Sequence, residues 1–106
     1  LVASLRILPP PPVADAGKDQ RVTHLSAVKL DGAGSSAGDG TTLAYSWVQT
    51  AGSPVEIVGA NTASPTFKAP PIPFQDLRFT LTVTDRFGFT ASDEVVVTIT
   101  PGRPGG

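Results

Sequence analysis

The chain has 106 residues, enough for one domain, and no cysteine, which excludes a disulfide framework and any thiolate zinc site. The net charge is −1 and only 16% of the residues are charged, so we expect no basic surface for nucleic acid. No apolar run approaches the ~20 residues that a membrane span needs, so membrane insertion is not expected either. Because 40% of the residues are hydrophobic, the chain is expected to fold.

Both ends of the chain carry a β-prone segment followed by prolines. The tail 1–11 joins the apolar segment Leu1–Leu8 to a run of prolines, which favours an extended and stiff conformation. Residues 101–106, P-G-R-P-G-G, form a second linker. The tail is either the end of a preceding module or a first strand or disordered arm of the same domain, which is predicted to span residues 12–100. The absence of Met, even at position 1, suggests a piece of a longer polypeptide.

Between the linkers, apolar residues recur with a period of two. Such alternation, with Thr at the intervening positions, is typical of half-buried strands. Turn-forming residues separate the alternating segments, and no window favours an amphipathic helix. The pattern predicts an all-β fold, an immunoglobulin-like antiparallel β-sandwich of about seven strands. The expected strands are Gln20–His24, Ala27–Leu30, Leu43–Gln49, Val55–Val58, Pro65–Phe67, Leu77–Thr84 and Thr90–Thr100, with the last two forming a hairpin across Asp85–Gly88.

The only tyrosine and the only tryptophan of the chain, Tyr45 and Trp47, are two residues apart. Residues at this spacing share one face of a strand, so Leu43, Tyr45 and Trp47 are expected to point the same way. An aromatic platform for a ligand would more naturally lie at a strand end or on an outer face. We therefore assign the pair to the structural core, with a partner expected for the Tyr45 hydroxyl. The further predicted core residues are Phe79, Leu81 and Val83.

Five stretches, in order over residues 12–100, resemble the polycystic-kidney-disease (PKD) type of domain. They are P-V-A-D-A-G-K-D-Q at 12–20, L-D-G-A-G-S-S at 30–36, Y-S-W-V-Q-T at 45–50, A-N-T-A-S-P-T-F at 60–67 and F-T-L-T-V-T-D at 79–85. Many PKD domains continue the Y-x-W motif with F-G-D-G, and this chain does not, so it is similar to the Y-x-W-x-Q-T variant. The resemblance implies an immunoglobulin-like sandwich without catalytic activity.

The same resemblance implies a calcium site, because some PKD domains bind Ca²⁺ through the opening segment and an acidic turn. The matching residues are Asp15 and Asp39, whereas Ala37 replaces a carboxylate of the family pattern. Calcium prefers six to eight oxygen ligands, so this loss weakens the site. The alternative is that these aspartates, like Asp31 and Asp85, hydrogen-bond turn backbones. We expect no cofactor, with calcium at Asp15 and Asp39 as the alternative.

The chain offers no arrangement typical of catalysis. Its only histidine, His24, lies on a predicted edge strand and is expected to be a surface histidine, and no nucleophile, zinc-protease or phosphate-loop motif occurs. Asp93 and Glu94 are neighbours on a strand and therefore point to opposite faces. The protein is thus expected not to be an enzyme. Aromatic residues near turns are candidate contact points, although hairpin packing is the alternative: Phe74, Phe87 and Phe89.

Together these features predict a non-catalytic module of a larger secreted or cell-surface protein that acts as a spacer or adhesive unit. Its expected partners are neighbouring domains of the same chain and a protein or polysaccharide ligand, not nucleic acid. Two alternatives stay open. One is an accessory module that binds polysaccharide or fibrous protein and is attached to a secreted hydrolase. The other is a subunit of a surface filament or layer, in which Leu1–Leu8 adds a strand to a neighbouring copy.

Overall fold

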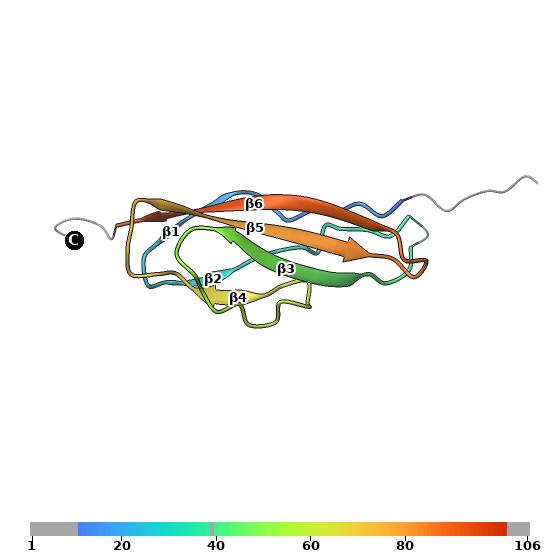
Figure 1. The fold of residues 1–106 in the computed structure, drawn as a ribbon, viewed down its shortest axis with the longest axis horizontal. Coiled ribbons are helices and arrows are strands. Elements are labelled where there is room, and N and C mark those ends of the chain that lie inside the picture. Colours follow the sequence, from blue (N-terminus) through green and yellow to red (C-terminus); the bar gives the residue numbers. More distant parts are fainter. Residues whose placement is uncertain (1–10, 39, 102–106) are drawn as a thin grey trace, which may run out of the picture.

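The computed structural model describes residues 11–38 and 40–101. All its regular elements are strands, so the predicted all-β class is confirmed (Figure 1). This part of the chain contains no helix long and apolar enough to cross a membrane. The described residues form six strands, which are β1 (Gln20–Thr23), β2 (Ala27–Lys29), β3 (Ala44–Ala51), β4 (Thr66–Lys68), β5 (Gln75–Thr84) and β6 (Thr90–Thr100).

The strands form the two layers of a sandwich (Figure 1). One sheet has four strands in the order β1-β6-β5-β3, and the other consists of β2 paired with β4. The long strands β5 and β6 pair from Gln75 opposite Ile99 to Thr84 opposite Thr90. The predicted hairpin across residues 85–88 is therefore confirmed, and it supplies the centre of the larger sheet.

The part of the chain that the structure describes has six strands where about seven were predicted, because Val55–Val58 does not form a strand. This segment contributes a single isolated bridge, between Val58 and Thr66. The side chain of Gln49 holds the start of this segment: its Nε2 donates to the carbonyl oxygen of Ser53 at 2.7 Å, and its Oε1 accepts from the N–H of Val55 at 2.9 Å. Backbone groups held by a side chain are not free for a strand ladder.

The strand pairs β2–β4, β3–β5 and β5–β6 are antiparallel, as predicted, whereas β1 and β6 are parallel. Gln20 lies opposite Val97 at one end of the pair, and Thr23 lies opposite Thr100 at the other. The path of the chain accounts for this pairing, since the N-terminal segment runs beside β6 in the same direction (Figure 1). The first and last strands of the domain are thereby joined directly.

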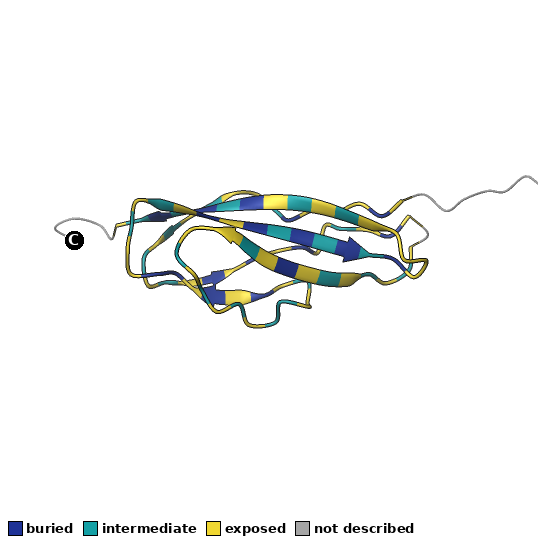
Figure 2. Ribbon diagram, viewed as in Figure 1, coloured by how far each residue is buried: buried dark blue, intermediate teal, exposed yellow. Residues whose placement is uncertain are grey.

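The hydrophobic core lies between the two sheets. Buried and exposed positions alternate along β5 and β6 (Figure 2), as the period-two pattern predicts. Phe67 of β4 meets Phe79 of β5 across the sandwich, with ring centroids 4.9 Å apart. Burial of each large apolar side chain stabilises the fold by about 1.5–3 kcal/mol. Its fully buried large members are Leu30, Leu77, Phe79, Leu81, Val83, Val95, Val97 and Ile99.

The described chain begins and ends at opposite ends of the long axis of the molecule (Figure 1). We call the end that holds Val13 and the β5–β6 turn (residues 85–89) the N-terminal pole. The other end, where β6 ends before Pro101, is the C-terminal pole. Leu25 and Phe74 lie at the C-terminal pole, because the N–H of His24 donates to Thr100 O at 3.0 Å and that of Phe74 donates to Ile99 O at 2.8 Å.

Candidate functional site

The aromatic pair of β3 lies within the fold. Trp47 is 3% exposed, and its indole N–H donates a 2.9 Å hydrogen bond to the carbonyl oxygen of Thr62. A Cβ at Gly32 would lie 2.9 Å from Trp47 Cζ2, so the ring packs directly on this glycine. Tyr45 is half-buried and packs against the same core. With Trp47 enclosed, the pair offers no platform on which a sugar ring could stack.

Asp15, one of the two predicted calcium ligands, organises a turn. Its Oδ1 accepts a hydrogen bond of 2.9 Å from the N–H of Gly17, and its own N–H donates to Ser35 Oγ at 2.8 Å. Asp15 and Asp31 both line one hollow of the surface. Asp31 accepts a 3.0 Å hydrogen bond from the N–H of Ala33. Both carboxylates therefore hold backbone amides, which is the usual role of Asp in turns.

The residues around Asp15 do not fit a calcium ion well. Within 11–38 and 40–101 there is no group of three or more His, Asp or Glu side chains that could hold a metal. Calcium needs six to eight oxygens, and Lys18 lines the same hollow with a positive charge. Asp39, the second predicted ligand, lies outside the described residues. The calcium hypothesis therefore gains no support from Asp15 and its neighbours.

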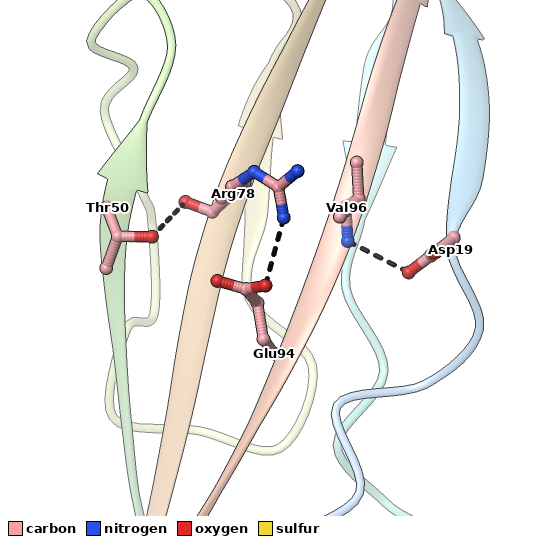
Figure 3. Close-up of polar contacts among 5 residues, drawn as sticks. All are labelled: Asp19, Thr50, Arg78, Glu94 and Val96. Atoms are coloured by element: carbon pink, nitrogen blue, oxygen red, sulfur yellow. Dashed lines mark hydrogen bonds and ion pairs between the residues drawn. The ribbon is translucent and has the colours of Figure 1, made fainter.

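Two other carboxylates fasten the N-terminal segment to β6. Asp93 Oδ2 accepts a 2.8 Å hydrogen bond from the N–H of Ala16. Asp19 Oδ1 accepts a 3.0 Å bond from the N–H of Val96, which Figure 3 shows. These bonds continue the pairing of β1 with β6 toward the N-terminal pole. Sequence reasoning missed this role, because each pair of partners is separated by 77 residues and nothing local indicates it.

The outer face of the larger sheet is polar, and its side chains bind one another. Arg78 forms an ion pair with Glu94 at 3.0 Å, and the hydroxyl of Thr50 donates to the carbonyl oxygen of Arg78 at 3.3 Å (Figure 3). The hydroxyl of Thr98 donates to Asp76 at 2.8 Å. The side chains of the ion pair are 45% and 48% exposed, so it stabilises the fold by at most about 1 kcal/mol. These contacts are typical of a solvated sheet surface.

The three predicted contact aromatics are exposed, and they lie at the two poles. Phe74 is 83% exposed and precedes β5 at the C-terminal pole, whereas Phe87 and Phe89 are about half exposed in the turn at the N-terminal pole. Asp85 builds this turn, since its Oδ1 accepts hydrogen bonds from the N–H groups of Phe87 at 2.9 Å and Phe89 at 3.0 Å. The guanidinium of Arg86 lies 4.7 Å from the centre of the Phe87 ring.

His24 lies in the connection between β1 and β2 and is half-buried. Its Nδ1 is buried without a hydrogen-bond partner. The prediction of an ordinary surface histidine is therefore wrong in this detail.

Comparisons with known proteins agree with this architecture. Residues 16–99 match the family "K319L-like, PKD domain". The solution structure of the PKD domain from the KIAA 1837 protein is similar, with a TM-score of 0.73 and 30% identity over 88% of this chain and 91% of that one. None of the curated proteins that were compared matches the chain significantly.

Two larger proteins contain a similar domain. One is a nucleoside hydrolase-related protein of Saccharophagus degradans associated with carbohydrate metabolism, with a TM-score of 0.69 and 26% identity over 84% of this chain and 25% of that one. The other is a 2,6-sialyltransferase of Photobacterium sp. JT-ISH-224, with a TM-score of 0.61 and 15% identity over 80% of this chain and 18% of that one, a likeness of fold alone. The chain thus spans a quarter or less of these two proteins. The match over residues 16–99 and the likeness to a solved PKD domain show that the chain belongs to the K319L-like PKD domain family and has an immunoglobulin-like β-sandwich fold.

Proposed function

We propose that this PKD domain is a spacer module of a larger secreted or cell-surface protein. PKD domains are typically non-catalytic and generally occur in extracellular or cell-surface proteins. The observation that carries the proposal is the placement of residues 11 and 101 at opposite poles (Figure 1). A module connected in this way adds its whole length to a row of domains. Its partners are the neighbouring domains of the same chain.

The pairing of the first and last strands supports a load-bearing role for the module. Because β1 and β6 are parallel and the chain ends lie at opposite poles, a pull on residues 11 and 101 slides these strands along each other. The paired positions then resist together instead of separating one by one. The hydrogen bonds from Ala16 to Asp93 and from Val96 to Asp19 lie in the same path.

Single-molecule pulling in two geometries tests the proposal. The chain has no cysteine, so thiol handles can be introduced at chosen exposed positions. Handles at Pro11→Cys and Pro101→Cys load the β1–β6 pair along its strands, whereas handles at Ile72→Cys and Pro101→Cys open the β5–β6 hairpin from one end. We expect a clearly higher unfolding force in the first geometry. Equal forces would contradict a load-bearing spacer.

One comparison favours a second candidate, an accessory module that binds polysaccharide. The similar Saccharophagus degradans protein is associated with carbohydrate metabolism. Against this candidate, Trp47 is buried and the exposed aromatics are divided between two poles. Depletion of the protein from solution by insoluble cellulose or chitin tests it directly, and the spacer proposal expects none. Strand exchange through Leu1–Leu8 stays a prediction, because this segment lies outside the described residues.

A further inference from the structure

The exposed large hydrophobic residues of the described chain gather at the poles. Three lie at the C-terminal pole: Leu25, Ile72 and Phe74, which are 49%, 61% and 83% exposed. Three lie at the N-terminal pole: Val13, Phe87 and Phe89, which are 57%, 49% and 48% exposed. Two others are comparably exposed: Val58, which lines the same surface hollow as Leu25, and Val48, which lies on β3 between the poles. Apolar groups that gather on a surface mark an interaction site more reliably than scattered ones.

The C-terminal pole displays its apolar side chains from unfavourable backbone conformations. Leu25 and Phe74, with φ of 67° and 64°, are the non-glycine residues of the described chain with positive φ. Such conformations are costly for large side chains and persist mainly where they serve a function. The backbone N–H groups of His24 and Phe74 donate to carbonyl oxygens at the end of β6. These bonds place Leu25 and Phe74 next to the point where the chain leaves the domain. The segment that follows Thr100 therefore starts within this apolar surface.

The N-terminal pole is built around the entry of the chain. Two hydrogen bonds set the N-terminal segment against β6, one between Ala16 and Asp93 and one between Asp19 and Val96, and in both the partners are 77 residues apart. The same offset, continued to Val13, places this residue beside Thr90. Val13 thus lies at the height of the turn that carries Phe87 and Phe89. The Asp85 carboxylate binds both phenylalanine N–H groups and holds this turn in shape.

We propose that the two poles form one interface, in which the C-terminal pole of one copy of this domain docks on the N-terminal pole of the next. The occupant is a second copy because both surfaces are apolar and each surrounds a chain end. A β-prone segment followed by proline also occurs at each end of the sequence, Leu1–Leu8 before the prolines at 9–12 and β6 before Pro101. This inference builds on the proposed spacer role and names the partner of the module.

A contact between two different surfaces of the same module joins copies head to tail. Because the two surfaces here lie at opposite poles, the contact extends into a straight or helical row. Between modules joined by a short linker the effective concentration is about 1 mM, so a weak interface suffices. Docked poles would keep successive modules from bending at their linkers.

Sedimentation velocity of the whole chain, at concentrations up to about 1 mM, tests this inference. We expect concentration-dependent association that Phe74→Gly abolishes. The same substitution should raise the melting temperature, because glycine adopts a φ of 64° without strain. This opposite effect distinguishes a lost contact from a damaged fold. Val48→Ser is the matched control, since Val48 is 56% exposed but lies on β3 away from both poles, and it should leave association unchanged.

A mixing experiment tests the pairing of unlike poles. Phe74→Gly removes an apolar side chain of the C-terminal pole, and Phe87→Ser removes one of the N-terminal pole. Each variant alone should therefore sediment as a monomer. An equimolar mixture retains one intact pole of each kind and should form a dimer but nothing larger. A monomeric parent chain throughout the range, or a single-pole variant that still self-associates, would overturn the inference. Neither result bears on the pulling experiment, which uses isolated molecules.

Discussion

Asp93, on the last strand, accepts a 2.8 Å hydrogen bond from the backbone N–H of Ala16, which lies 77 residues earlier. Ala16 is 1% exposed, so water has little access to replace this bond. With the matching bond from Val96 to Asp19, it joins the start of the domain to its end ahead of β1. Carboxylate hydrogen bonds as well as strand pairing therefore join the N-terminal segment of the domain to its last strand.

The first prediction concerns the hydrogen bond between Asp93 and Ala16. Asp93→Ala should lower the free energy of unfolding by about 1–3 kcal/mol, because it leaves a buried N–H without an acceptor. Glu94→Ala is the control, since the neighbouring Glu94 forms only an exposed ion pair with Arg78, and it should cost about 0–1 kcal/mol. Urea unfolding of both variants measures the difference. Equal losses would mean that the Asp93 bond contributes nothing beyond a surface contact.

The second prediction concerns the contact between Gly32 and Trp47. Gly32→Ala should destabilise the domain by about 1–3 kcal/mol and shift the Trp47 emission, because the added methyl meets the indole ring. Gly88→Ala is the control for a generic glycine effect. Its φ is 88° and a Cβ there meets nothing within 4 Å, so it should cost stability without moving the emission. An unchanged emission in Gly32→Ala would disprove the packing described for the tryptophan.

The third prediction concerns the Gln49 side chain, which binds the backbone of residues 51–55. Gln49→Ala should accelerate amide hydrogen exchange at Val55, because the N–H of that residue loses its acceptor. The free energy of unfolding should fall by about 1–2 kcal/mol. Thr50→Ala removes an exposed 3.3 Å contact on the next residue and should leave Val55 protected. Protection that persists in Gln49→Ala would show that another group holds this segment.

The fourth prediction concerns calcium. We expect the melting temperature to be the same with calcium and with a chelator, because Asp15 and Asp31 already hold backbone amides. A higher melting temperature with calcium would reveal an ion that binds the folded state preferentially. Asp15→Asn and Asp39→Asn would then identify the ligands by removing that increase.

The features that sequence reasoning predicted well depend on local pattern. The alternation from Thr90 to Thr100 is that of a strand with one buried face, and β6 has those bounds. The features that it missed depend on side-chain bonds and strand pairings that no local pattern shows. The Gln49 side chain binds the N–H of Val55, six residues later, where a strand was expected, and β1 lies parallel to β6, 77 residues later in the chain. The positive φ of Leu25 has no sequence signal, because leucine rarely adopts it.

The measurement that tests the central claim most directly is the unfolding force of a double variant, Asp19→Ala with Asp93→Ala. With handles at Pro11→Cys and Pro101→Cys, the account predicts a marked loss of force relative to the chain with both aspartates. With handles at Ile72→Cys and Pro101→Cys, it predicts a much smaller change, which controls for lower stability. An unchanged force in the first geometry would contradict the claim that these carboxylates and the β1–β6 pair carry the load between the poles.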